Sequence, residues 1–205
     1  MMLLRSHAEL ARLAVVNFLL HFAHHIFSAV WVLYAGHRYG WTAWEVGLLL
    51  AMVGVLDMII QGVVVGPAVK RFGDRKTMVF GLCGGAFGVA LMGFAPTGLI
   101  QYLAMLPNAL WGLAMPTLQS LMTRRVSESE QGQLQGANMS VASIAGIASP
   151  VFFGLIYSMS VGPGLAIEWS GLAFYISATI LAVAAMLGWR VARAGKSKVQ
   201  AAPAE

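Results

Sequence analysis

A group of polar side chains near the start of the chain has residue types and spacing that could move protons or bind a polar ligand. Its members are spaced i, i+4, i+7 and i+11, which places them on one face of a helix. They are Asn17, His21, His24 and Ser28, with His25 at the edge of the face. An unperturbed imidazole changes charge at about pH 6.5. This face could therefore relay protons or line a watery cavity, while hydrogen bonding to neighbouring helices is the structural alternative.

Histidines one turn apart also suit a metal ion. Such a site needs further His, Cys or carboxylate ligands to complete the coordination shell. The chain has one cysteine, Cys83, and no second acidic or histidine cluster lies within an apolar stretch. We therefore expect no metal and no cofactor.

A single carboxylate, Asp57, lies well inside another apolar stretch, and Gln61 follows one helical turn later on the same face. A charge at membrane depth costs roughly 2.5 to 3.5 kcal/mol on insertion scales, so the residue needs an explanation. A desolvated carboxyl group could bind and release a proton near neutral pH. The alternative is an aspartate that pairs with a neighbouring helix and never titrates in the working range.

A third polar group, Asn108 with Trp111, lies in a stretch that Pro107 and Pro116 interrupt. A broken helix leaves carbonyl groups without donors, which lipid tolerates only against protein or a watery cavity. This stretch is therefore a second candidate for lining a pathway.

The elements that must position these residues are apolar runs long enough to cross a bilayer. Charged residues make up 10% of the 205 residues and apolar ones 59%, whereas a soluble domain has about 25% charged residues. We predict an all-α integral membrane protein with transmembrane spans at 12–36, 45–69, 77–95, 98–122, 134–159 and 169–190. No nucleophile–base pair or phosphate-binding loop is visible, so an enzyme is not expected.

The basic residues predict the orientation of these spans. One set of span ends carries Arg5, Arg12, Lys70, Arg71, Arg75, Lys76, Arg124, Arg125, Arg190, Arg193, Lys196 and Lys198, and the other carries only Arg38. The positive-inside rule places the first set, with both termini, in the cytoplasm of a multi-pass protein of the plasma (bacterial inner) membrane. The net charge of +5 therefore indicates a membrane and not nucleic acid. We expect a cytoplasmic segment at 1–11, the bundle at 12–192 and a disordered cytoplasmic tail at 193–205.

Two further patterns predict how the spans sit. Aromatic residues at the outer ends suggest an interfacial belt made of Trp31, Tyr34, Tyr39, Trp41, Trp44 and Trp169. Small residues recur in the fifth span at helix-packing intervals, which predicts a close helix–helix contact there. They are Gly136, Ser140, Ser143, Gly146, Ser149 and Gly154.

Two loop sequences carry a family resemblance. The first is Gly66-Pro-Ala-Val-Lys70-Arg71-Phe-Gly73-Asp74-Arg75-Lys76, and the second is Pro116-Thr-Leu-Gln119-Ser-Leu-Met-Thr-Arg124-Arg-Val126 followed by Gln131-Gly-Gln-Leu-Gln-Gly136. Together with Trp31-Val-Leu-Tyr and Arg38-Tyr-Gly-Trp41, they resemble the carboxy-terminal half of tetracycline-resistance transporters of the major facilitator superfamily. The resemblance extends from about residue 12 to about residue 190.

The resemblance implies a six-helix half built from two inverted three-helix repeats, with the first and fourth spans lining a central cavity. It implies a cytoplasmic gating loop made of Gly66, Lys70, Arg71, Gly73, Asp74 and Arg75, with the glycines allowing a tight turn. It also departs from the tetracycline exporters, because Gly85 stands where their third span of this half carries an acid.

The function that the resemblance implies is proton-coupled efflux of small amphipathic compounds by alternating access. The expected partners are the lipid bilayer, a small-molecule substrate, protons, and a second six-helix half or a second copy of the chain. The alternative is a non-transporting membrane remnant or scaffold of the same fold that requires a partner half.

Overall fold

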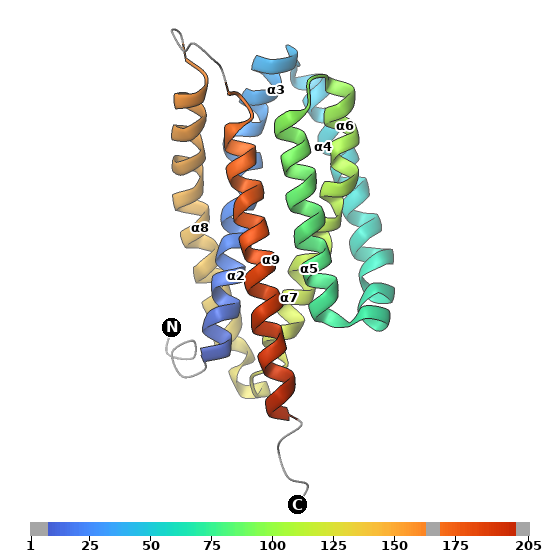
Figure 1. Cartoon of the computed structure of the whole chain (residues 1–205), viewed down its shortest axis with the longest axis vertical. Coiled ribbons are helices and arrows are strands. Elements are labelled where there is room, and N and C mark those ends of the chain that lie inside the picture. Colours follow the sequence, from blue (N-terminus) through green and yellow to red (C-terminus); the bar gives the residue numbers. More distant parts are fainter. Residues whose placement is uncertain (1–7, 163–168, 200–205) are drawn as a thin grey trace, which may run out of the picture.

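The computed structural model describes residues 8–162 and 169–199, and side chains from Glu9 to Val191 within them. The helices lie side by side along one long axis (Figure 1). They are, in order, α2 (Ala8–His24), η1 (Phe27–Trp31), α3 (Val32–Tyr39), α4 (Ala43–Ile59), η2 (Ile60–Val64), α5 (Val65–Phe94), α6 (Gly98–Ala109), η3 (Leu110–Leu113), α7 (Ala114–Thr123), η4 (Glu128–Glu130), α8 (Gln131–Ser160) and α9 (Leu172–Val199). The described part of the chain contains no strand, and the predicted all-α membrane fold is confirmed.

Long apolar helices dominate the described residues. Four stretches are long and apolar enough to cross a membrane, namely Glu9–Tyr39, Ala43–Phe94, Glu128–Ser160 and Leu172–Val191. Within the second stretch the chain reverses at Gly73, whose φ of 78° and ψ of 157° are not helical. The segment from Gly98 to Thr123 is interrupted by the 3₁₀ turn η3. The arrangement is therefore compatible with the six predicted spans.

The best-packed part of the bundle is α5, which contacts α9, α6 and α7. Its glycines let the backbones approach closely. A Cβ atom on Gly88 would lie 2.4 Å from the backbone nitrogen of Asn108, and one on Gly81 would lie 2.8 Å from the carbonyl oxygen of Leu110. At the end of the bundle opposite the Gly73 turn, a Cβ on Gly171 would collide with the carbonyl oxygen of Gly93. Close backbone approach of this kind is how helices associate in lipid.

The predicted contact surface in the fifth span is only partly present. Nothing lies within 4 Å of a Cβ placed on Gly136 or Gly154, and Ser140 and Ser143 are exposed. For these four residues the predicted contact is not made within the described residues. Where α8 contacts α2, Gly146 lies against His25 and the buried Ser149 bonds to α2, as described below.

The aromatic belt is also only partly present. Trp44 and Trp169 are exposed, at 72% and 60%, as a belt requires. Trp31 and Tyr34 are instead core residues, at 3% and 0%. For these two the prediction was wrong, because a buried ring needs only a partner for its polar tip. The Tyr34 hydroxyl donates to the Met92 carbonyl at 2.9 Å.

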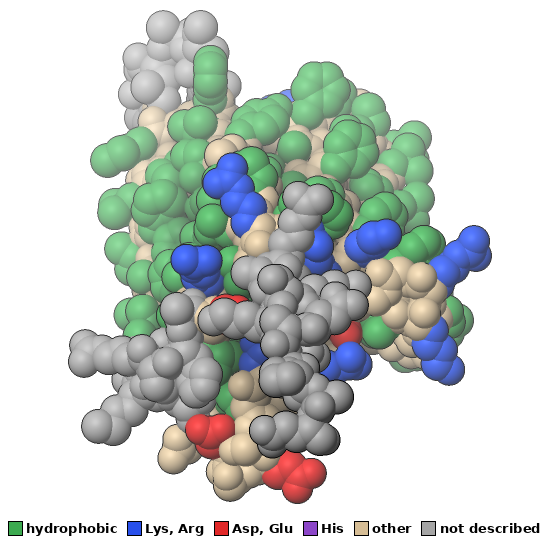
Figure 2. Space-filling view, turned by 60° about the horizontal axis from the view of Figure 1, so that its bottom comes forward, with side chains coloured by type: hydrophobic (Ala, Val, Ile, Leu, Met, Phe, Trp, Pro, Cys, Tyr) green, Lys and Arg blue, Asp and Glu red, His purple; other side chains and the backbone are tan. Residues whose placement is uncertain are grey.

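The end of the bundle that carries the turn at Gly73 also holds the start of α2 and the last turns of α9 (Figure 1). Lys and Arg side chains gather on this face of the molecule (Figure 2). The helix α9 continues to Val199 and so extends into the segment predicted as a tail at 193–205. Ala, Arg and Lys are good helix formers, and they allow the helix to continue beyond its apolar part. Residues 1–7 and 200–205 lie outside the described residues.

Candidate functional site

A cavity of about 1000 Å³ lies between the first, second and fourth helical segments. Its polar lining residues are His24, His25, Ser28, Asp57, Gln61, Asn108 and Gln119, and its aromatic ones are Phe27, Trp31 and Trp111. The structure thus brings together His24, Ser28, Asp57, Gln61, Asn108 and Trp111 from the predicted pathway. A mostly apolar cavity with a few convergent polar groups is typical of small-molecule sites.

Each of the three helical segments that line the cavity contains one irregular turn. The first segment has the π-helical turn Phe27–Trp31, the second has the π-helical turn Ile60–Val64, and the fourth has the 3₁₀ turn Leu110–Leu113. Such turns re-aim side chains and occur frequently at functional sites. The prolines at 107 and 116 predicted a break in the fourth segment, and that prediction agrees with the 3₁₀ turn between them.

Asp57 projects its carboxylate toward the fourth segment. Its Oδ1 atom would lie 3.6 Å from a Cβ on Gly112, so a glycine in η3 leaves room for it. Asp57 is half-buried, and among the described side chains no Lys, Arg or His lies within ion-pair distance of it. A carboxylate at membrane depth without a counter-charge favours binding of a proton or a cation.

Trp111 lines the cavity, packs against the rings of His24 and Phe27, and is 6% exposed. The His24 ring packs edge-on against it, with ring centroids 5.3 Å apart. On the other side its Cγ lies 3.0 Å from the position of a Cβ on Gly85. A larger side chain at position 85 would therefore collide with this tryptophan. Gly85 and Trp111 are complementary in size.

Two polar atoms of this wall are buried without a hydrogen-bond partner among the described residues, namely Asn108 Oδ1 and Trp111 Nε1. An unsatisfied buried group costs about 1–3 kcal/mol. Asn108 lies near the end of α6 and Trp111 in η3, so the junction of these two elements carries both atoms.

Two predicted pathway residues do not line the cavity. Asn17 is buried at 4% exposure and lies about 10 Å from His24 along the helix axis, while the cavity begins only at Leu20. The helical spacing predicted the face of the helix on which Asn17 lies, but not its position along the helix axis relative to the cavity. His21 is half-buried and lies outside the lining residues. Conversely, sequence reasoning left Gln119 and Trp31 out of the site, although the polar character of Gln119 beside Pro116 was visible.

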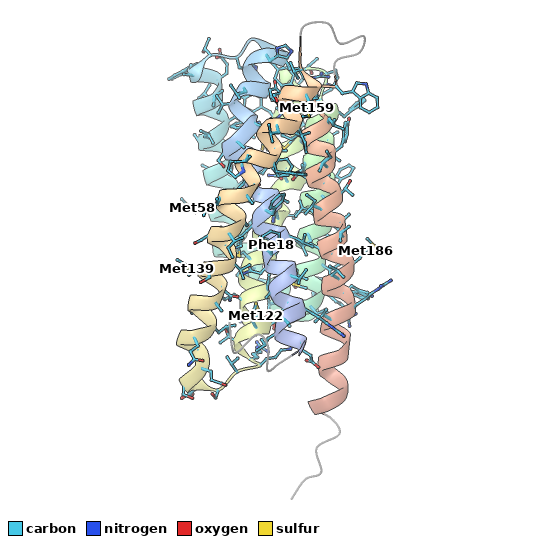
Figure 3. The ribbon with its side chains drawn as sticks, turned by 90° about the vertical axis from the view of Figure 1, so that its left-hand side faces the viewer. Phe18, Met58, Met122, Met139, Met159 and Met186 are labelled. Atoms are coloured by element: carbon cyan, nitrogen blue, oxygen red, sulfur yellow. The ribbon has the colours of Figure 1, made fainter. Side chains whose placement is uncertain are left out.

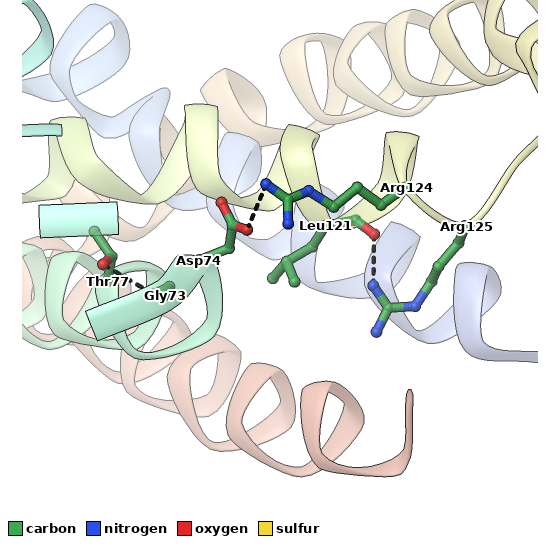
Figure 4. Close-up of polar contacts among 6 residues, drawn as sticks. All are labelled: Gly73, Asp74, Thr77, Leu121, Arg124 and Arg125. Atoms are coloured by element: carbon green, nitrogen blue, oxygen red, sulfur yellow. Dashed lines mark hydrogen bonds and ion pairs between the residues drawn. The ribbon is translucent and has the colours of Figure 1, made fainter. Parts of the chain in front are cut away.

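The predicted gating loop is organised around Asp74. Gly73 has the positive φ of 78° that a tight turn requires, and the Thr77 hydroxyl donates to its carbonyl at 3.0 Å. Gly66 lies inside regular helix, so its predicted role in the turn is wrong, because one positive-φ residue suffices for the reversal. Asp74 is 8% exposed and pairs with Arg124 at 3.4 Å (Figure 4).

The basic residues of this loop are used in different ways. The Arg75 guanidinium stacks over the Trp189 ring of α9 at 3.9 Å. Lys70 and Arg71 are exposed. Next to Arg124, Arg125 bonds to the Leu121 carbonyl (Figure 4) and pairs with Glu9 of α2 at 3.4 Å. The consecutive arginines thus connect the end of α7 to α5 and to α2.

Comparison with known proteins decides the family. The model of the Major Facilitator Superfamily matches residues 13–205. The chain belongs to this superfamily. Members of the superfamily are membrane transporters and not enzymes, as the sequence predicted.

Among superfamily members, the chain is 34% identical over 179 residues to the class C tetracycline resistance protein of Escherichia coli, covering 87% of this chain and 44% of that protein. It is 33% identical over 171 residues to the class G protein of Vibrio anguillarum, covering 83% and 42%. It is 30% identical over 161 residues to the class B protein of Escherichia coli, covering 78% and 40%. The predicted branch is confirmed, and the chain spans less than half the length of these relatives.

Proposed function

We propose that this chain is the carboxy-terminal half of a proton-coupled exporter of small amphipathic compounds. The observation that carries the proposal is Asp57, a carboxylate on the wall of a cavity that aromatic rings help to line. Among the described side chains none supplies it with a counter-charge. The aromatic rings supply apolar contact area, and the amide and imidazole groups supply a few hydrogen bonds. A compound with an apolar body and polar substituents fits that lining.

Proton coupling follows from the same carboxylate. Protonated Asp57 is neutral and stable in an apolar cavity, whereas ionised Asp57 attracts a proton or a cationic group. If substrate and proton both stabilise the residue but exclude each other, loading one releases the other. Alternating access then exchanges them across the membrane.

The second half of the transporter would cover α4 and α8. In the most apolar window of each membrane-crossing stretch, only 11% of residues are buried for Ala43–Phe94 and 17% for Glu128–Ser160, against 44% for the first and last stretches. Met58 of α4 and Met139 of α8 project on the same side of the bundle (Figure 3) and are 73% and 69% exposed. A six-helix half, or a second copy of the chain, packed there would close the cavity.

The basic end of the bundle supports a cytoplasmic location of both termini in the plasma (bacterial inner) membrane. The Asp74–Arg124 and Arg125–Glu9 pairs lie at this end and link neighbouring segments. We assign to Gly73, Asp74 and Arg124 the role of a cytoplasmic gate whose contacts change between the two access states.

The proposal is tested by transport in membrane vesicles prepared from cells that produce the chain. Tetracycline and the fluorescent cation ethidium serve as probes, and a pH gradient is imposed. Wild type should move at least one probe in response to the gradient, and Asp57→Asn should reduce that flux to background. Glu128→Gln, a change on the exposed η4 turn, is the control and should transport normally. Unchanged flux in Asp57→Asn would reject the coupling role, and no gradient-driven flux of any probe would favour the scaffold alternative.

A further inference from the structure

The first helical segment is interrupted beside the cavity. Its α-helix α2 ends at His24, and the π-helical turn η1 begins at Phe27. The last four carbonyl groups of an α-helix have no intrahelical donor. Here the His21 carbonyl still accepts from the His25 N–H at 3.2 Å. The next carbonyls, those of Phe22 and Ala23, need partners from elsewhere in the bundle, because lipid offers no donor.

Two buried serines from different helices supply those partners. The Ser149 hydroxyl of α8 donates to the Phe22 carbonyl at 2.6 Å, and the Ser177 hydroxyl of α9 donates to the Ala23 carbonyl at 3.0 Å. Both serines are 0% exposed. Most other serine hydroxyls on these helices, such as Ser160, bond to a carbonyl of their own helix. Ser149 and Ser177 instead bond to another helix, and both do so at the end of α2.

A third contact fixes the same place. The imidazole Nε2 of His25 lies 3.2 Å from the position of a Cβ on Gly146, one turn before Ser149 on α8. A larger residue at 146 would push His25 toward the cavity. The turn of α8 from Gly146 to Ser149 is thus shaped to receive the interrupted part of the first segment.

We propose that Ser149 and Ser177 are positioning residues that hold the π-helical turn and so set the cavity wall formed by Ser28, Trp31 and Val32. The two hydroxyls donate to the Phe22 and Ala23 carbonyls. The backbone N–H groups that would bond to these carbonyls in an α-helix therefore need not do so. Without the hydroxyls, those carbonyls take the N–H groups four residues on, and α2 continues through His25. A π-helical turn holds one residue more than an α-helical turn. Each residue turns an α-helix by about 100°, so loss of that extra residue would rotate the wall side chains about the helix axis. The positioning role rests on the proposed function in one respect only, namely that the wall contacts the substrate.

Thiol labelling tests the positioning role without any transport assay. The exposed Cys83 is first replaced by alanine, and Ser28→Cys is introduced as a reporter on the cavity wall. The rate at which a water-soluble maleimide labels this cysteine is then measured in the reporter chain alone and in the same chain carrying Ser149→Ala, Ser177→Ala or both. Each single change should slow labelling of position 28 several-fold, and both together should slow it more.

Matched controls separate positioning from general destabilisation. Ser160→Ala also removes a buried hydroxyl, but one that bonds to its own helix, and should leave labelling at 28 unchanged. Gln61→Cys, on the opposite wall, should label at the same rate with or without Ser149→Ala. Ser149→Thr, which keeps a hydroxyl, should restore the rate. If the double variant fails to fold, the single variants decide.

The outcomes are distinguishable from failure of the proposed function. Unchanged labelling at position 28 in folded Ser149→Ala and Ser177→Ala would overturn the positioning role. A labelling change in a chain that transports nothing would uphold the positioning role and reject the transport proposal. Where transport is measurable, the serine variants should raise KM several-fold more than they lower kcat.

Discussion

The bundle has two regions that differ in how closely their helices approach. Around α5, glycines at 81 and 88 bring backbones into contact, so that any side chain there would collide with a neighbouring backbone. On α4 and α8, glycines at 54 and 136 have nothing within 4 Å. Glycine therefore allows close backbone contact around α5, the closed region, and lies on an uncovered helix surface on α4 and α8, the open region. The closed region holds the bundle together, and the open region flanks the cavity, as expected if a partner completes it.

The largest expected effect compares one glycine from each region. Gly88→Ala places a Cβ 2.4 Å from the Asn108 backbone, which cannot move away, and should destabilise the chain by about 3 kcal/mol. Gly54→Ala meets nothing and should be neutral or stabilising by about 0.5 kcal/mol, because alanine favours helix. Thermal unfolding of both variants in detergent measures this. Equal losses would show that the two regions are packed alike.

A smaller effect is expected at the outer end of the closed region. The Arg38 guanidinium donates to the Ala95 carbonyl and to the Ser170 hydroxyl, each at 2.9 Å, and so joins α3 to the ends of α5 and α9. Arg38→Gln should cost about 1 kcal/mol, since the Tyr39 hydroxyl still donates to Ala95. Arg12→Gln, on the exposed face of α2, is the control and should cost less than about 0.5 kcal/mol. The same unfolding measurement checks both, and a loss for Arg12→Gln as large as for Arg38→Gln would contradict it.

The smallest effect is expected at the ion pair between Asp74 and Arg124. The Arg124 side chain is 71% exposed, so its pairing with Asp74 should contribute only about 0.5 kcal/mol. A double-mutant cycle with Asp74→Asn and Arg124→Gln measures the coupling energy. The energy should shrink as salt is raised, because exposed charges are screened. A coupling above about 2 kcal/mol that does not respond to salt would mean that the pair is a closed structural contact.

Much of the site follows from helical periodicity. The spacing of His24 and Ser28 predicted their shared face, and the single intramembrane acid drew attention to Asp57 and Gln61. Periodicity predicts which face of a helix a residue lies on, but not how far along the helix a cavity extends. Asn17 therefore shares the predicted face and still lies outside the cavity. The π-helical turns at 27–31 and 60–64 contain no proline and so leave no local signal. The first of them depends, in our proposal, on partners far away in sequence, such as Ser149.

The open face of α8 shows a second limit of sequence reasoning. Small residues at helical spacing indicate that a close approach is possible, but not whether the neighbour belongs to the same bundle. Gly146 and Ser149 meet α2, while Gly136 and Ser140 on the same helix face no other helix of the described residues. A pattern of this kind predicts a contact surface without naming what covers it.

The central claim is that Asp57 exchanges its proton for substrate, and proton release on binding tests it most directly. The purified protein in weakly buffered detergent solution is mixed with tetracycline or ethidium while a pH-sensitive dye is monitored. The account predicts that wild type releases protons as it binds, and that Asp57→Asn binds without releasing any. Equal proton release from wild type and Asp57→Asn would contradict it.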